Sequence, residues 1–160
     1  MPACLRLFLT ALLGCVTSLS VRAADGTVTI ENRDAALHQT VVGTWLSAQD
    51  AGVASVAMYT TYREDGIAIQ LIKTKFIFQK AKGVWIENRW SIRNGELHLT
   101  PLRFRASSDD AKVDQEEAVR RSLSVDAHEM AYELKGKERK ERRSSLPGDV
   151  QQMLVELAPK

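Results

Sequence analysis

The sequence predicts a mainly β protein: a single antiparallel barrel-like domain with a short N-terminal segment and a C-terminal helix. Three observations predict this fold class. Apolar and polar residues alternate with period two along most of the chain between residues 56 and 134. Short clusters of Gly, Asn and Asp separate the alternating runs, and 160 residues suffice for one modest core.

The first 23 residues have the three parts of a secretory signal peptide. Arg6 precedes the apolar run Leu7–Leu13, and the small-residue site Val21–Ala23 follows. We therefore expect residues 1–23 to be removed and residues 24–160 to form the β domain, exported to a bacterial periplasm or the extracellular space.

A second interpretation of the leader stays open. Leu12–Cys15 resembles a bacterial lipobox, in which Cys15 would be lipidated after removal of a signal over residues 1–14, and would anchor the protein to a membrane. Cys4 and Cys15 are the only cysteines, so neither mature form would contain a disulfide.

The charge balance disfavours a nucleic-acid partner. The chain has 22 Lys and Arg against 20 Asp and Glu, a formal net charge of +2. Arg6 and Arg22 both lie in the leader, so the remaining domain is neutral, whereas nucleic-acid-binding domains are strongly basic.

The first elements can be placed from local patterns. Residues 27–42 suit a short helix or turn that leads into the first main strand. Alternation over 56–62 and 67–71 predicts two strands joined by the turn Glu64–Gly66. A turn at Ala81–Gly83 leads into a half-buried strand over 84–92.

The next elements follow the same rules. Asn94-Gly95 predicts a type I′ hairpin turn, because both residues tolerate a positive φ. The strand that follows is expected to break or end at Pro101. The acidic stretch 106–118 suits a surface connector or, alternatively, a lid over a cavity.

The last third predicts a hairpin, an edge strand and a helix. Val119, Arg121, Leu123 and Val125 alternate in one strand, and a second covers residues 130–134. The mixed-charge run 138–143 suits a solvated edge strand. Apolar spacing after Pro147 predicts a short helix.

Three segments resemble the lipocalin-like (calycin) domains of exported bacterial proteins. Gly43-Thr44-Trp45 is similar to the Gly-x-Trp at the entrance of their first strand, Tyr62–Gly66 to a hairpin with an acidic residue and Gly, and Trp90–Leu99 to their "Trp-x-Ile, turn, Gly, x-Leu-x-Leu" hairpin. The resemblance covers roughly residues 42 to 134.

The resemblance implies a role for Trp45 at the closed end of a barrel. It would pack there beneath an arginine from a late strand, with Arg121 or Arg105 as candidate cation–π partners. A small β domain of META-type heat-shock lipoproteins shares the early Gly-x-Trp and remains an alternative.

No motif points to catalysis. His38, His98 and His128 have no partner at a metal-ligand spacing. The chain also lacks a Gly-x-Ser-x-Gly elbow, a phosphate-binding Gly-rich loop and a Rossmann fingerprint. We therefore expect no catalytic residues, no metal, no cofactor and no enzymatic activity.

Two functions remain. The first is a binding module whose barrel holds a small apolar or amphipathic ligand. The second is an envelope protein with a filled core that acts through surface contacts, with Trp85 as an exposed contact residue opposite the apolar face of its strand. Five aromatic residues are candidates to line the ligand cavity: Tyr62, Phe76, Phe78, Trp90 and Phe104.

Overall fold

The computed structural model describes residues 29–108 and 113–159, which form two helices and eight strands. The signal peptide predicted over 1–23, with Cys15, lies outside the described residues. The elements are α1 (Ile30–Val41), β1 (Gly43–Asp50), β2 (Ala54–Tyr62), β3 (Ile67–Phe76), β4 (Lys82–Arg93), β5 (Glu96–Ala106), β6 (Ala118–Val125), β7 (Glu129–Leu134), β8 (Lys137–Arg143) and α2 (Gly148–Leu157).

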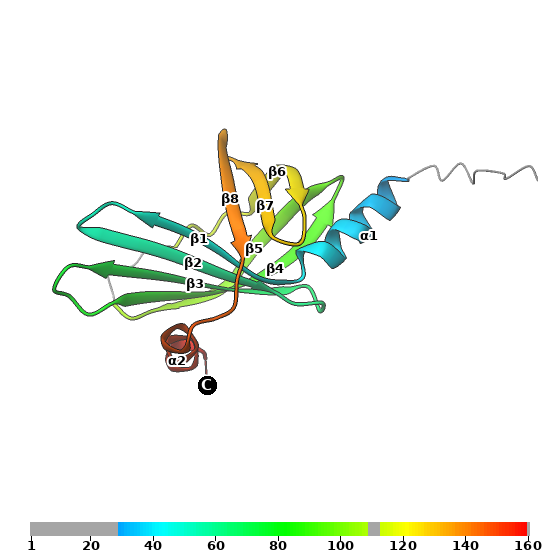
Figure 1. Cartoon of the computed structure of the whole chain (residues 1–160). Coiled ribbons are helices and arrows are strands. Elements are labelled where there is room, and N and C mark those ends of the chain that lie inside the picture. Colours follow the sequence, from blue (N-terminus) through cyan, green and yellow to red (C-terminus); the bar gives the residue numbers. More distant parts are fainter. Residues whose placement is uncertain (1–28, 109–112, 160) are drawn as a thin grey trace, which may run out of the picture.

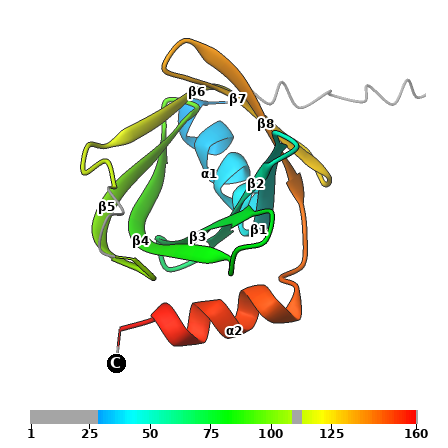
Figure 2. The same cartoon turned by 90° about the vertical axis from the view of Figure 1, so that its left-hand side faces the viewer.

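The eight strands form one closed barrel in which every strand is antiparallel to its neighbours. Closure comes from β1 and β8, where Trp45 pairs with Arg143 and Leu46 with Arg142 (Figure 1). Figure 2, seen from the end opposite α1, shows the strands as a ring with α2 outside it. The predicted single antiparallel barrel with a short N-terminal segment and a C-terminal helix is confirmed, and the N-terminal segment contains the helix α1.

α1 covers one end of the barrel. The side chain of Thr29 caps the helix by accepting a hydrogen bond from the amide of Asn32, at 3.3 Å. At the other end of the helix, the indole of Trp45 donates to the carbonyl of Val41 at 2.7 Å. Both Val41 and Trp45 are fully buried, so this contact joins the helix to the first strand.

The predicted Asn-Gly turn is confirmed, and it also holds α1 in place. Asn94 and Gly95 have φ values of 54° and 75°, as a type I′ turn requires. Their amides donate to the two carboxylate oxygens of Asp34 in α1, at 2.8 and 2.7 Å. One carboxylate thus satisfies both amides of the turn.

The main core lies inside the barrel at the end that α1 covers. Trp90 of this core stacks on His38 of α1, with ring centroids 4.3 Å apart, and meets the ring of Tyr62 edge-on. The buried members are Val41, Trp45, Tyr62, Ala68, Trp90, Leu97, Leu99, Leu123, Met130 and Tyr132.

A second, smaller core lies outside the barrel under α2. Leu71 and Trp85 point outward from β3 and β4, and Val150 of the helix packs against them. The expectation that Trp85 is an exposed contact residue is therefore wrong, since α2 leaves it only 4% exposed. Gly83 permits this close approach, because a methyl group there would overlap the sulfur of Met153.

Neither described helix is long and apolar enough to cross a membrane.

Two expectations about the last strands are corrected. The run 138–143 is not an edge strand, because β8 pairs with both β7 and β1, and Glu141 faces the interior at 2% exposure. In β6, a bulge at Ser122, whose φ is 50°, breaks the predicted alternation. As a result Arg120 is buried while Arg121 is exposed.

Candidate functional site

The interior of the barrel is not filled along its whole length. The core packs the end near α1, and towards the other end there is a cavity of about 390 Å³. Its walls come from the inward faces of β2 to β7 and from the segment before β6, and more than half of the lining residues are apolar. The apolar wall residues include Met58, Ile72, Val84, Ile86, Leu99, Pro101 and Leu134.

A second compartment adjoins this cavity. It measures about 250 Å³ and shares Met58, Ile72, Tyr132 and Leu134 with the first. Its other walls come from β1, β2 and β8: Ser47, Gln49, Val56 and Arg139. The two compartments thus divide the same interior space, and shifts of a few flexible side chains such as Met58 would join them.

A row of amide and hydroxyl groups forms one polar wall. Asn88 donates to the amide oxygen of Gln70 at 3.0 Å, and Gln70 donates to the hydroxyl of Thr60 at 3.3 Å. Asn88 and Thr60 are 2% and 0% exposed. Because buried polar groups are costly unless they are paired, these hydrogen bonds are what allow the row to stand beside an apolar cavity.

A buried ion pair lies between the cavity and the core. The guanidinium of Arg120 is 3.0 Å from Glu141, and both side chains are almost fully buried. The hydroxyl of Tyr132 donates to the same carboxylate at 2.6 Å, and the guanidinium lies over the Tyr132 ring, 4.3 Å from its centroid. Arg120 and Tyr132 also line the cavity, so the pair meets the open space.

Burial and neighbouring charges shift the pKa values of Tyr62, Tyr132 and Arg120. Burial raises the pKa of Tyr62 far above its usual value, even though neighbouring Arg120 acts in the opposite direction. Burial likewise raises the pKa of Tyr132. For Arg120, burial alone would lower the pKa, but the adjacent Tyr62 and Glu141 outweigh it and keep the guanidinium charged.

Several polar atoms here have hydrogen-bonding capacity that no described residue uses. They are Nε and Nη1 of Arg120, Oε2 of Glu141 and the hydroxyl of Tyr62. The Nη1 atom is close enough to Glu141 for charge attraction, but it lacks the alignment of a hydrogen bond. Buried donors without acceptors are rare in folded proteins, and they favour a ligand or solvent oxygen at this place.

The mouth of the cavity carries charge from the segment before β6. Asp114, Glu116 and Glu117 line it together with Lys135 of the turn after β7. Lys135 pairs with Asp114 at 3.0 Å. A backbone hydrogen bond from Glu116, aided by Lys135, holds the pKa of Asp114 below its usual range. The Asp114 carboxylate therefore stays ionised at neutral pH.

None of the five aromatic residues expected to line the cavity does so. Tyr62 and Trp90 point inward but belong to the packed core next to α1. Phe76 and Phe104 lie at the opposite end and are about 40% exposed. Phe78 is fully exposed in the turn after β3. Alternation gave the correct inward face for β2, but it could not show how far along the barrel the core extends.

Gly43 and Trp45 occupy the place that the resemblance implies, but with a different partner. The guanidinium of Arg143 in β8 lies over Trp45, 4.4 Å from the ring centroid. Arg121 and Arg105, the two expected cation–π partners of Trp45, are therefore wrong. Arg121 is exposed beside Glu96, and Arg105 of β5 is paired with Trp85 of β4. Gly43, at φ 126°, leaves room for the Arg143 side chain.

No family model matches this chain, and a search of curated proteins finds no relative for it.

Proposed function

We propose that this protein binds a small amphipathic ligand inside its barrel and that it acts as a carrier without catalysing a reaction. The observation that carries the proposal is the cavity of about 390 Å³, which has apolar walls and the buried guanidinium of Arg120 at its inner end. Ligand sites in proteins have this size and this combination of apolar walls with a few placed polar groups.

The polar groups indicate the chemistry of the ligand. Arg120 offers only donors, and its Nε donates to no described residue. A ligand oxygen, from a carbonyl, hydroxyl or acid group, would supply an acceptor. Met58, Ile72 and Ile86 surround the space beyond it, which suits an aliphatic or aromatic body. The proposed ligand thus has one oxygen-bearing end and one apolar end.

The alternative of a filled-core envelope protein has less support. It requires a barrel packed by its own side chains, and it used Trp85 as a surface contact. The cavity argues against the first condition, and the burial of Trp85 under α2 removes the second.

Export belongs to the same proposal. We expect the carrier to reach the periplasm or the extracellular space, either cut after Ala23 or anchored through a lipidated Cys15. The denatured mass of the protein from its own cells distinguishes these two forms. A native mass that exceeds the denatured mass by a constant amount would reveal the bound ligand.

A cavity-filling variant tests the binding site directly. Ile72→Trp places a large ring in the space shared by both compartments, whereas Ile67→Trp puts the same ring on the opposite face of the same strand. The probe is anilinonaphthalene sulfonate, which has an apolar body and one acidic end.

We expect Ile72→Trp to lose most probe fluorescence and Ile67→Trp to keep it, with cooperative thermal unfolding in both. Equal probe binding by these two folded variants, or no saturable binding by the unmodified protein, would overturn the proposal.

A further inference from the structure

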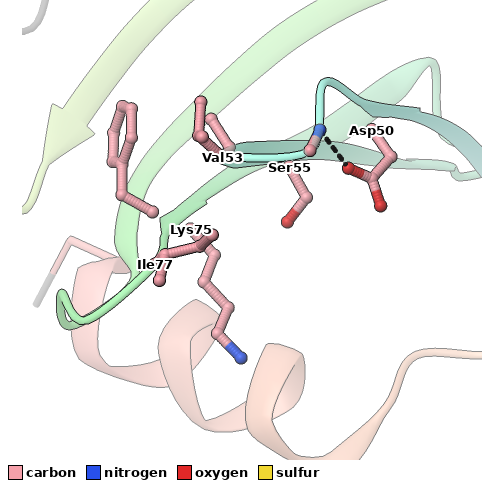
Figure 3. Close-up of a pocket in the computed structure, with 8 residues that line it drawn as sticks. Asp50, Val53, Ser55, Lys75 and Ile77 are labelled. Atoms are coloured by element: carbon pink, nitrogen blue, oxygen red, sulfur yellow. Dashed lines mark hydrogen bonds between the residues drawn. The ribbon is translucent and has the colours of Figure 1, made fainter.

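Exposed apolar side chains gather at the end of the barrel opposite α1. They belong to the loop between β1 and β2 and to the turn after β3: Val53, Phe76, Ile77 and Phe78. We call these four residues the open-end patch. The amide of Ile77 donates to the carbonyl of Val53 at 3.2 Å, so the two loops are held together. Figure 3 shows Val53 and Ile77 side by side at these loop ends.

Phe78 is the clearest anomaly in the patch. Its side chain is fully exposed, and its φ of 64° lies in the left-handed region that residues with a Cβ rarely adopt. A glycine or asparagine would suit this turn better and would expose no aromatic ring. The fold gains nothing from a phenylalanine here, so its presence points to a contact outside the chain.

Three lysines lie on the β3–β4 hairpin close to the patch in sequence. Lys75, Lys80 and Lys82 are exposed on the strands and turn that carry it, and none forms an ion pair with a described residue. Asp50 is the nearby acid, and one of its oxygens accepts a hydrogen bond from Gly52 (Figure 3). The loop ends therefore combine an apolar tip with positive charge around it.

The patch is continuous with the interior of the barrel. Val56 of β2 lines the second compartment. Two residues closer to the loop on the same strand, Ala54 is paired with Phe76 of the patch. An apolar surface thus runs from the cavity to the loop ends.

We infer that the open-end patch docks on the surface of a phospholipid bilayer that contains anionic lipids. Phe78 and its neighbours would enter the region between headgroups and acyl chains, and the three lysines would meet the lipid phosphates. A bilayer fits better than a protein pocket, because the apolar residues project from loop tips and three exposed lysines lie on the same hairpin as three of them. This contact needs neither a lipid anchor nor a bound ligand.

The test measures binding of the protein, as isolated from its own cells, to vesicles by flotation. One set of vesicles contains phosphatidylcholine alone, and the other contains equal parts of phosphatidylcholine and phosphatidylglycerol. The variants are Phe78→Asp, the pair Lys80→Gln with Lys82→Gln, and the control Ile30→Asp. Ile30 is also exposed and apolar, but it lies in α1 at the other end of the barrel. Thermal melts verify that each variant is folded.

We expect Phe78→Asp to reduce the partition coefficient by about tenfold or more on both vesicle types, because the variant lacks the ring that would be buried in the bilayer. The double lysine variant should lose roughly tenfold or more on anionic vesicles and little on neutral ones. Ile30→Asp should bind as the unmodified protein does. Equal binding by Phe78→Asp and Ile30→Asp would overturn the inference, as would an unmodified protein that fails to float with anionic vesicles.

Discussion

Arg143 at the end of β8 lies over the indole of Trp45 at the start of β1, and its guanidinium also donates to three carbonyls. These are the carbonyls of Thr40, Val42 and Ala127, at 2.6, 2.9 and 3.1 Å. One side chain therefore joins the last strand, the first strand, the end of α1 and the turn between β6 and β7. It fastens the barrel at the point where its two end strands meet.

Replacing this side chain should loosen the closed end. Arg143→Met loses the three hydrogen bonds and the cation–π contact, and we expect a loss of about 1–2 kcal/mol in the free energy of unfolding, measured by urea titration. Arg142→Met is the matched control, since no hydrogen bond from its neighbouring, exposed side chain is present in the described structure. Equal losses in the two variants would contradict this role for Arg143.

The buried ion pair predicts a non-additive double mutant. Arg120→Met leaves Glu141 charged and without its cation, which should cost about 3–5 kcal/mol. Adding Glu141→Gln removes that charge while Tyr132 keeps an acceptor, so the double variant should be more stable than Arg120→Met alone. Chemical denaturation of the four proteins measures the coupling, and strictly additive losses would refute it.

Alkaline pH should destabilise the protein through its buried tyrosines. The pKa of Tyr62 is raised in the folded state mainly by burial, whereas in the unfolded chain it is about 10. The unfolded chain therefore releases this proton first. The contribution is fully present below pH 10 and is lost as the pH rises further, by about 1.4 kcal/mol per pH unit.

Tyr62→Phe isolates this contribution. Removing the hydroxyl should make the fall of stability above pH 10 shallower, and Tyr132, whose pKa is also raised, should account for part of the remaining slope. Because no described residue bonds to the Tyr62 hydroxyl, stability near neutral pH should change little. The measurement is the melting temperature as a function of pH, and an unchanged alkaline slope would disprove the assignment.

The contact between α1 and the β4–β5 turn predicts a further loss. Asp34→Ala leaves the amides of Asn94 and Gly95 without their carboxylate, which should cost about 1–2 kcal/mol. Glu31→Ala, an exposed substitution in the same helix, should cost less than about half of that. Thermal unfolding of both variants measures the difference, and a loss no larger for Asp34→Ala would argue against it.

The sequence predicted the barrel class and its best-defined turn because these depend on local rules. Alternation marks a strand with one buried face, and Asn94-Gly95 has few alternatives to the turn it makes. The outward core was not predictable in this way. Leu71 and Trp85 lie on the outer face of the barrel, and they are buried only because α2, which is far away in the sequence, packs over them.

The cavity was harder to predict because its decisive residues are charged. Alternation placed Arg121 with Leu123 on one face, but the bulge at Ser122 turns Arg120 inward instead. Glu141 sits in a run of six charged residues that suggests a solvated strand. Only barrel closure, which depends on residues about a hundred positions apart, buries one charge of that run beside another.

The seams of the barrel are unequal in length, and this has a consequence for its opening in solution. β5 joins β6 only where Leu97–Leu99 faces residues 118–120, and β1 joins β8 only at Trp45 and Leu46, within the described residues. The long ladders therefore hold β1 to β5 together as one unit. The strands β6 to β8 form a second unit, which we call the flap, and it is joined to the first by fewer residue pairs. In hydrogen exchange, amides at these two seams should exchange ahead of those in β3 and β4. We therefore expect β6 to β8 to be the part of the wall that separates first in solution.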